Sequence, residues 1–305
     1  MILRGSLTLE IPSLSAFQNQ DFPSASLYVI ATPIGNLGDI TLRALHILSL
    51  VDGIACEDKR HSLLLLKHYG IRKPMVAIHE HNEIEAAKKL MDHLQAGERW
   101  AYLSDAGTPG VSDPGARLVA EVQINGYQTI PIPGPSALTA MLSIAGEVMI
   151  ASRGQFQFLG FLPTSKNDFE EALRLMIESP IPTIFYESPH RLAKTLIRFS
   201  ELLDNGRRLS IGRELSKKFE SLFLLRADEI PGWLENPNHL KGEFVFILEG
   251  NNRKTITENH EPWHLAQLLS KQLSSKDLSI VLQSMYGLQK NEAYDLALAA
   301  KKGGG

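Results

Sequence analysis

The 305-residue sequence predicts an α/β protein with two α/β domains and a small C-terminal helical appendage. Two observations support this fold class. Short apolar runs alternate with longer helical patterns between Leu27 and Glu249, and the pattern becomes purely helical from His260 onward. We expect a flexible N-terminal extension at 1–26, α/β domains at 27–146 and 147–252, and a helical region at 253–305.

The first domain is predicted to be doubly wound. Its strand candidates are apolar on both faces, as buried parallel strands are: Leu27 to Ala31, Gly53 to Cys56, Met75 to His79, Trp100 to Leu103 and Thr129 to Ile132. Helix-start signals separate them. These signals are Asp39 before the Leu42, Leu45 and Leu48 stripe, a capping box of Asn82 and Glu85, Asp113 before Pro114, and Pro133-Gly-Pro135.

The second domain follows an irregular stretch near Gly146 to Gly154. Its strand candidates are Phe156 to Phe161, Thr183 to Glu187, Leu209 to Gly212, Ser221 to Arg226 and Glu243 to Glu249. Ser188 and Pro189 start a helix that runs to about Leu203, with Leu192, Leu196 and Phe199 on one face. The tail has helical stripes at Leu265 to Leu273, Leu278 to Met285 and Ala293 to Leu298.

Composition limits the possible partners and compartment. A hydrophobic content of 44% is enough for full cores, and a net charge of -3 gives no global field to attract a polyanion. Nucleic-acid contacts would need local basic patches, for which the candidates are the pairs Lys59-Arg60, Arg72-Lys73, Arg207-Arg208 and Lys217-Lys218, although such pairs are usually solvated surface. Cys56 is the only cysteine, and no apolar run approaches the ~20 residues of a membrane span, so we expect a cytoplasmic protein with no membrane association.

Three Gly- and Pro-containing loops follow predicted parallel strands, where open α/β sheets bind ligands. They are Thr32-Pro-Ile-Gly-Asn36, Ser104-Asp-Ala-Gly-Thr-Pro-Gly110 and Pro131-Ile-Pro-Gly-Pro-Ser136. Exposed amides beside a helix start would suit a carboxylate. The first loop is not Gly-x-Gly-x-x-Gly and has no P-loop lysine, which argues against dinucleotide or triphosphate binding. Each loop alone is equally compatible with an ordinary turn.

A set of ordered motifs resembles one family. The motifs are Thr32-Pro-Ile-Gly-Asn-Leu37 with Asp39, Glu57-Asp58-x-Arg60-His61, Ser104-Asp-Ala-Gly-Thr-Pro109, Pro133-Gly-Pro-Ser136, and Phe185-Tyr-Glu-Ser188 with His190-Arg191. Together they are similar to the bacterial 16S ribosomal RNA 2′-O-cytidine methyltransferases, a branch of the tetrapyrrole methylases. The similarity covers about Leu27 to Glu249, with a weaker echo at Lys290 to Tyr294.

The resemblance implies a tetrapyrrole-methylase-like fold, an S-adenosyl-L-methionine (SAM) cleft between the two α/β domains, a 16S rRNA substrate in the small ribosomal subunit, and a homodimer. Carried over by position, the cofactor-binding residues are Pro33, Ser104, Asp105, Ala106, Gly107, Pro133, Gly134, Ser136, Tyr186, Gly212 and Phe244. The implied substrate-binding residues are Asn36, Asp39, Lys59, Glu187, His190, Arg191 and Arg213.

The catalytic candidates are Glu57, Asp58, Arg60 and His61. Methyl transfer to a ribose hydroxyl needs alignment and a base, which can contribute about 10²–10⁴-fold. Glu57 and His61 are the better candidates for the base, because Asp58 is equally well explained as a helix cap. Arg60 can bind a phosphate through its forked donors or be an ion-paired surface residue.

Other charged residues have simpler explanations. His79, Glu80, His81 and Glu83 resemble a metal cluster, yet the reaction needs no metal and an Asn82 cap explains much of the pattern, so we predict none. Asp39 is more simply a helix cap than a substrate contact. Glu187 and the Arg213-Glu214 pair are charged residues beside apolar strands. They either line the cleft or form a buried inter-domain ion pair, and we favour the cleft lining.

Three positions depart from the family pattern. Lys59 replaces the usual Thr, the 146–154 stretch lacks the usual Gly-Leu-Pro, and Asp295 stands where a basic residue is common. Two alternatives therefore stay open beside the RNA methyltransferase. One is a tetrapyrrole (precorrin-type) C-methyltransferase, and the other is a non-catalytic RNA-binding module that retains the fold.

Overall fold

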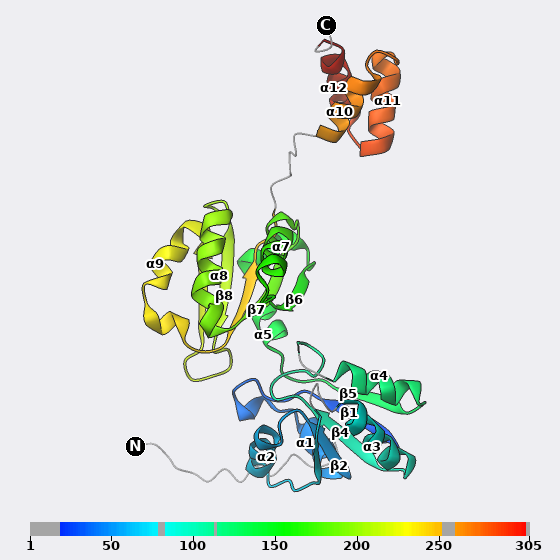
Figure 1. Cartoon of the computed structure of the whole chain (residues 1–305), viewed down its shortest axis with the longest axis vertical. Coiled ribbons are helices and arrows are strands. Elements are labelled where there is room, and N and C mark those ends of the chain that lie inside the picture. The colour runs from blue at the N-terminus through cyan, green and yellow to red at the C-terminus, as the bar shows by residue number, and fades with distance from the viewer. Residues whose placement is uncertain (1–18, 79–82, 113–114, 252–259, 303–305) are drawn as a thin grey trace. The chain divides into compact units, whose positions relative to one another are not determined.

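The computed structural model describes residues 19–78, 83–112, 115–251 and 260–302. The chain divides into two compact units, Met1–Gly250 and Asn251–Gly305. The first unit contains two five-stranded β-sheets, each covered by helices on both faces (Figure 1). The α/β fold class with a helical C-terminal region is confirmed.

The first sheet is parallel throughout, with the strand order β3-β2-β4-β1-β5. Its strands are β1 (Ser26–Ile30), β2 (Gly53–Cys56), β3 (Met75–Ala77), β4 (Arg99–Leu103) and β5 (Gln128–Ile132). All five lie where apolar runs predicted them. Because the strands are parallel, the three predicted ligand loops leave the sheet at the same edge.

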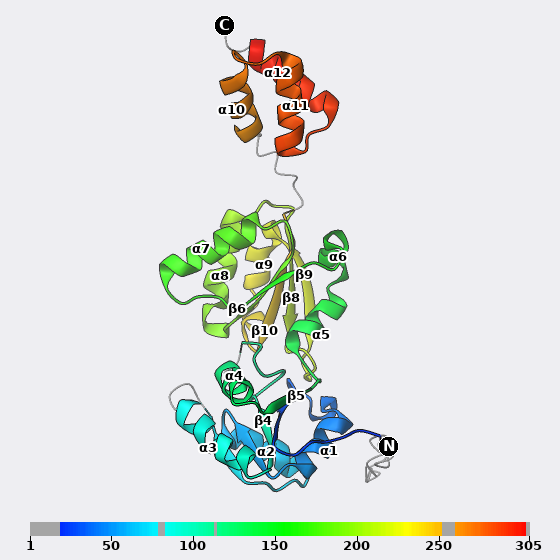
Figure 2. The ribbon, with the colours of Figure 1, turned by 90° about the vertical axis from the view of Figure 1, so that its right-hand side faces the viewer.

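Helices cover both faces of this sheet. Helices α1 (Leu42–Leu50) and α2 (Lys59–His68) pack on one face, where Ile47 and Leu66 contribute to the core. Helices α3 (Glu83–Gln95) and α4 (Ala116–Ile124) pack on the other, where Leu90 and Val122 do the same (Figure 2). The prediction of a doubly wound sheet is confirmed.

One predicted helix cap is wrong. Asp39 does not cap α1, because the chain first forms a 3₁₀ turn, η2 (Leu37–Asp39), whose cap is Asn36. Thr41 is the cap of α1, and its side chain accepts a hydrogen bond from the Ala44 amide at 3.1 Å. The expected starts at Asn82 and at Asp113-Pro114 lie outside the described residues.

The second sheet is mixed and has the order β6-β7-β10-β8-β9. Only β6 and β7 are parallel; the other pairs are antiparallel. The strands are β6 (Gln157–Phe161), β7 (Thr183–Glu187), β8 (Arg208–Arg213), β9 (Ser221–Arg226) and β10 (Phe244–Leu248). Each matches its predicted apolar run within two residues.

Two groups of helices enclose the second sheet (Figure 2). One face carries α7 (Lys166–Glu178), α8 (Pro189–Leu202) and α9 (Ile230–Leu234). The 3₁₀ turns η4 (Ala227–Glu229) and η5 (Pro237–Leu240) precede and follow α9. The other face carries α5 (Ala137–Ile144) and α6 (Gly146–Met149). The predicted start of a helix at Ser188-Pro189 is confirmed, with Leu192, Leu196 and Phe199 buried.

The connection between the sheets differs from the expectation of an irregular stretch. Residues 146–152 form α6 and the 3₁₀ turn η3 (Ile150–Ser152). Met141 of α5 is fully buried against Ile184 and Val245 of the second sheet. The chain therefore begins to cover the second sheet before residue 146, and the domain boundaries 27–146 and 147–252 stay predictions.

The second unit is helical, as its sequence stripes predict. It consists of α10 (His260–Leu269), α11 (Ser275–Tyr286) and α12 (Lys290–Lys302). Its small core contains Ala266, Leu278, Leu282, Ala293 and Ala297. Among the described residues, no helix combines the length and apolar character needed to cross a membrane.

Candidate active site

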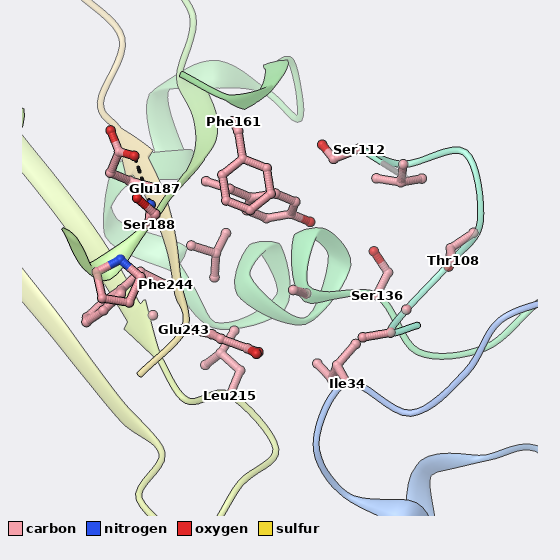
Figure 3. Close-up of a pocket in the computed structure, with 18 residues that line it drawn as sticks. Ile34, Thr108, Ser112, Ser136, Phe161, Glu187, Ser188, Leu215, Glu243 and Phe244 are labelled. Carbon is pink, nitrogen blue, oxygen red and sulfur yellow. Dashed lines mark hydrogen bonds between the residues drawn. The ribbon is translucent and has the colours of Figure 1, made fainter. Parts of the chain in front are cut away.

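A cavity of about 360 Å³ lies between the two sheets of the first unit, at the carboxyl edge of the parallel sheet. The loops after β1, β4 and β5 form one wall, and the ends of β6, β7, β8 and β10 form the other. Figure 3 shows Thr108 and Ser112 on one side of the cavity, facing Phe161 and Glu187 on the other. Its volume suits a small organic ligand.

The wall from the second sheet is aromatic. Tyr186 is half-buried, and its ring contacts Phe158 and Phe161 in edge-to-face geometry at centroid separations of 5.1 and 5.4 Å. Such contacts hold aromatic rings in fixed orientations. The side chain of Phe161 is 57% exposed, so this ring is available to a ligand in the cavity.

The wall from the first sheet is built by pairing two of the predicted loops. The Thr32 amide donates to the Gly107 carbonyl at 2.8 Å, and the Gly107 amide donates back to Thr32 at 3.0 Å. Ser104 is buried, and its hydroxyl donates to the Gly107 carbonyl at 3.1 Å. These two amides are therefore occupied within the protein, and the expectation that exposed loop amides suit a carboxylate stays a prediction for the other amides of the loops.

The predicted cofactor residues divide into two groups. Six of them line the cavity: Ala106, Gly107, Ser136, Tyr186, Gly212 and Phe244. The other five do not line it: Pro33, Ser104, Asp105, Pro133 and Gly134. Ser104 acts through the loop that it holds, and Asp105 points to the neighbouring strand end described below.

Glu187 is a buried carboxylate at the cavity wall, with only 1% of its surface exposed. Thr195 donates to Oε2 at 2.8 Å, the Ser188 amide donates to Oε1 at 2.8 Å, and Arg191 forms an ion pair at 3.3 Å. The Arg191 guanidinium also donates to the carbonyls of Leu162 and Pro163. Arg191 therefore fixes the segment after β6, while His190 is exposed at the start of α8.

The catalytic candidates lie at the carboxyl end of β2. Asp58 caps α2 by accepting from the Arg60 amide at 2.8 Å, so the helix-cap interpretation is confirmed. The Arg60 guanidinium binds the same carboxylate at 2.6 Å and holds the pKa of Asp58 at about 2. Lys59 and Arg60 are both exposed, with 89% of the Arg60 side chain accessible.

Asp105 joins the loop after β4 to the loop after β2. One carboxylate oxygen accepts from the Asp58 amide at 3.1 Å, and the other lies 3.0 Å from His61 Nδ1. This contact raises the pKa of His61. Glu57 is half-buried and its Oε2 has no hydrogen-bond partner among the described residues. Burial, with a smaller effect from Asp105, raises the pKa of Glu57.

A second, more open cavity of about 580 Å³ adjoins the first and shares Ile34, Ser136 and Leu215 with it. Asp39 and Gly134 line this second cavity. Ser216 of the loop after β8 donates a hydrogen bond to the Asp39 carboxylate. This hydrogen bond links the loop after β1 to the loop after β8. Asn36 is exposed beside it as the cap of η2.

Glu187 lines the first cavity, whereas Arg213 and Glu214 line neither of the two cavities, so their expected place in the cleft lining stays a prediction. Arg213 donates to the carbonyls of Lys241 and Phe219, and Glu214 accepts from Lys217 at 3.0 Å. Both residues brace the loop after β8.

The Arg207-Arg208 pair is also engaged within the protein. Arg207 is buried and donates to the carbonyls of Glu249 and Ile177, while Arg208 pairs with Glu249 and Glu147. Of the residues that resemble a metal cluster, His79, Glu80 and His81 lie outside the described residues and the side chain of Glu83 is not described, so the expectation of no metal there stays a prediction.

Several cavity residues were missed by the sequence interpretation: Val111, Ser112, Phe161 and Leu215. Phe161 ends β6 beside the end of its parallel neighbour β7, so the same carboxyl-edge rule that selected the other loops would have found it. Ser112 has a positive φ of 69°, which the sequence does not signal.

The fold and the cavity define an α/β enzyme that takes a small organic ligand between two covered sheets. Residues 26–231 match the family of tetrapyrrole (corrin/porphyrin) methylases. The chain is 42% identical over 274 residues to the ribosomal RNA small subunit methyltransferase I of Pasteurella multocida, covering 89% of this chain and 96% of the relative. It is 41% identical over 276 residues to the same enzyme of Haemophilus influenzae, covering 90% and 96%.

Two solved structures share the fold. The methyltransferase CobJ aligns with a TM-score of 0.56 at 16% identity over 74% of this chain and 94% of that chain. A Thermus thermophilus uroporphyrin-III C-methyltransferase in complex with S-adenosyl homocysteine aligns with a TM-score of 0.50 at 19% identity over 74% and 97%. The chain belongs to the tetrapyrrole methylase family, and it is a methyltransferase.

Proposed function

We propose that this protein transfers a methyl group from SAM to the ribose 2′-hydroxyl of a cytidine in the 16S rRNA of the small ribosomal subunit. The single observation that carries the proposal is the extent of the match to relatives named ribosomal RNA small subunit methyltransferase I. That match covers 89–90% of this chain and 96% of each relative.

The cavity fits SAM in size and chemistry. An adenosyl group needs a flat apolar surface, which Tyr186, Phe161 and Phe244 offer, and small neighbours, which Ala106 and Gly107 provide. The sulfonium carries a positive charge, and the described lining of the cavity includes the carboxylates of Glu187 and Glu243, whose ion-pair partners Arg191 and Lys217 are not among its lining residues. When bound, the cofactor supplies an electrophilic methyl group.

We assign the cofactor to the cavity and the acceptor nucleotide to the loop edge beside it. Pro33, Ser104 and Gly134 hold the loops in place, while Tyr186 and Gly212 contact the ligand directly. The exposed side chains of Lys59, Arg60 and His190, with Asn36 and Asp39, lie on segments that border this edge and are available to an RNA strand. Because the net charge is only -3, phosphate binding depends on such local contacts.

The test is methyl transfer from labelled SAM to 30S subunits that lack the modification. We expect label in ribose, found as one 2′-O-methylcytidine after nuclease digestion. Transfer only to a uroporphyrinogen-like acceptor would favour the C-methyltransferase alternative instead. Failure to bind S-adenosylhomocysteine in calorimetry would favour the non-catalytic RNA-binding alternative.

The proposal includes a cytoplasmic homodimer without a bound metal. Sedimentation equilibrium checks the oligomeric state, and a chelator such as EDTA should leave the transfer rate unchanged. A monomer that is fully active on 30S subunits would contradict the dimer. A loss of activity that added metal restores would contradict the metal-free reaction.

A further inference from the structure

The loop edge beside the cavity contains two groups able to accept a proton, Glu57 and His61. They differ in access. One carboxylate oxygen of Glu57 is buried without a partner among the described residues, whereas the His61 side chain is 62% exposed. A base must come within hydrogen-bond distance of the hydroxyl that it deprotonates, so access favours the histidine.

Asp105 fixes which nitrogen of His61 is basic. An ionised carboxylate only accepts hydrogen bonds, so the Nδ1 atom, 3.0 Å from Asp105 Oδ2, carries a hydrogen. In the neutral ring the lone pair is then on Nε2, which lies on the opposite side of the imidazole. The second oxygen of Asp105 accepts from the Asp58 amide at 3.1 Å, which prevents the carboxylate from turning away.

The Asp105–His61 pair lies next to the cavity because Asp105 is adjacent in sequence to residues that line it. Asp105 directly precedes Ala106 and Gly107, which line the cavity. The paired backbone of Gly107 and Thr32 holds this loop, and α2 holds His61 in its first turn. Two rigid elements from neighbouring strands therefore position the histidine.

We propose that His61 is the general base for methyl transfer and that Asp105 is the residue that positions it. This inference rests on the proposed reaction at a ribose hydroxyl. The His61 Nε2 atom accepts the proton of the 2′-hydroxyl while the ribose oxygen bonds to the methyl carbon and the carbon–sulfur bond breaks. The products are the 2′-O-methyl ribose, S-adenosylhomocysteine and an imidazolium that releases its proton to water.

The charges around His61 support this role. Asp105 and Asp58 face it with negative charge, Arg60 faces it with positive charge, and Glu57 lies on the same loop. The hydrogen bond to Asp105 is the largest influence and raises the pKa of His61 above its ordinary value of 6.5. A base whose pKa lies closer to neutrality is better matched to the working pH.

The experiment compares the pH dependence of single-turnover methyl transfer to 30S subunits in wild type, D105N and H61Q. Asparagine keeps the shape of the side chain and can still accept from the Asp58 amide. The chain offers a matched control in E98Q, because Glu98 forms a similar pair with His93 at 2.9 Å, with both side chains partly exposed. The ring pKa of His61 is measured in parallel by NMR, with its signal assigned through H61Q.

We expect H61Q to lose about 10²–10⁴-fold in rate. In D105N the rate should fall about tenfold or more, and the acidic limb of the profile should move to lower pH together with the His61 ring pKa. S-adenosylhomocysteine affinity should stay unchanged in both variants, and E98Q should match wild type throughout.

Three results would overturn the inference. The first is an acidic limb of the pH–rate profile that persists in H61Q. The second is an acidic limb that stays in place in D105N although the pKa of the His61 ring moves. The third is a D105N defect that is confined to cofactor affinity. If wild type transfers no methyl group to ribose, the proposed function fails and the base role fails with it. In that case the ring titration still shows whether Asp105 and His61 are paired.

Discussion

Gly212 in β8 lines the cavity, and replacing it with alanine should disturb the side chains packed around it. A Cβ added there would lie 2.7 Å from Met141 Sδ, 3.1 Å from Val245 Cγ1 and 3.2 Å from Leu215 Cδ1. The φ angle of Gly212 is not positive, so the effect of G212A is steric rather than conformational. Val245 and Leu215 line the cavity, so their displacement changes its shape.

Overpacking of a filled core costs about 1–3 kcal/mol. The loss of glycine entropy in the unfolded chain offsets about 0.4–1 kcal/mol of this. We therefore expect G212A to lower the free energy of unfolding by about 1–2 kcal/mol, which corresponds to a decrease in Tm of about 2–8 °C. S-adenosylhomocysteine binding, measured by calorimetry, should weaken at the same time.

The matched control is G206A, because a Cβ at Gly206 meets nothing within 4 Å. This variant should be neutral or slightly stabilising and should bind the ligand like wild type. A double-mutant cycle with M141A tests the contact itself: once the sulfur is removed, G212A should be less costly by about 0.5–2 kcal/mol. Additive effects of the two changes, or a G212A protein identical to wild type in Tm and affinity, would refute the steric argument.

Three further predictions concern single side chains. Y186A should weaken S-adenosylhomocysteine binding by about 1–3 kcal/mol, the usual loss for a ring that stacks on a base, while Y186F should retain most of the affinity in the same calorimetric assay. R191A leaves the buried Glu187 without its cation and should destabilise the protein by about 3–5 kcal/mol in urea unfolding, and a wild-type midpoint would contradict this. Because the folded-state pKa of Glu57 is raised, its ionisation opposes folding. The stability of E57Q relative to wild type should therefore increase as the pH rises from below 4.5 through the raised pKa of Glu57. A relative gain found only at acidic pH would contradict this direction.

Local patterns predicted the secondary structure well because each strand is a short apolar run that the fold buries. Thr183–Glu187 and Ser221–Arg226 match their predicted bounds in full. Asp39 shows where local reasoning failed. Both Asp39 and Thr41 are good cap residues, and the choice between them depends on the 3₁₀ turn that precedes the helix.

The site was harder to predict, because its contacts join distant parts of the chain. Asp105 and His61 are 44 positions apart, and they meet because β2 and β4 are neighbours in the sheet. From its position in the motif, Asp105 was expected to bind the cofactor. In the structure it contacts His61 instead, because β2 and β4 are adjacent in the sheet. Arg207 is a second example. Its place in a basic pair suggested a phosphate contact, whereas in the fold its guanidinium donates to main-chain carbonyls.

The central claim is ribose methylation of small-subunit rRNA. Its most direct test maps 2′-O-methylation across the 16S rRNA of a strain from which this gene is deleted, before and after the intact chain is restored. We expect methylation at one cytidine to disappear on deletion and to return with wild type but not with H61Q. An unchanged methylation map in the deletion strain would contradict it.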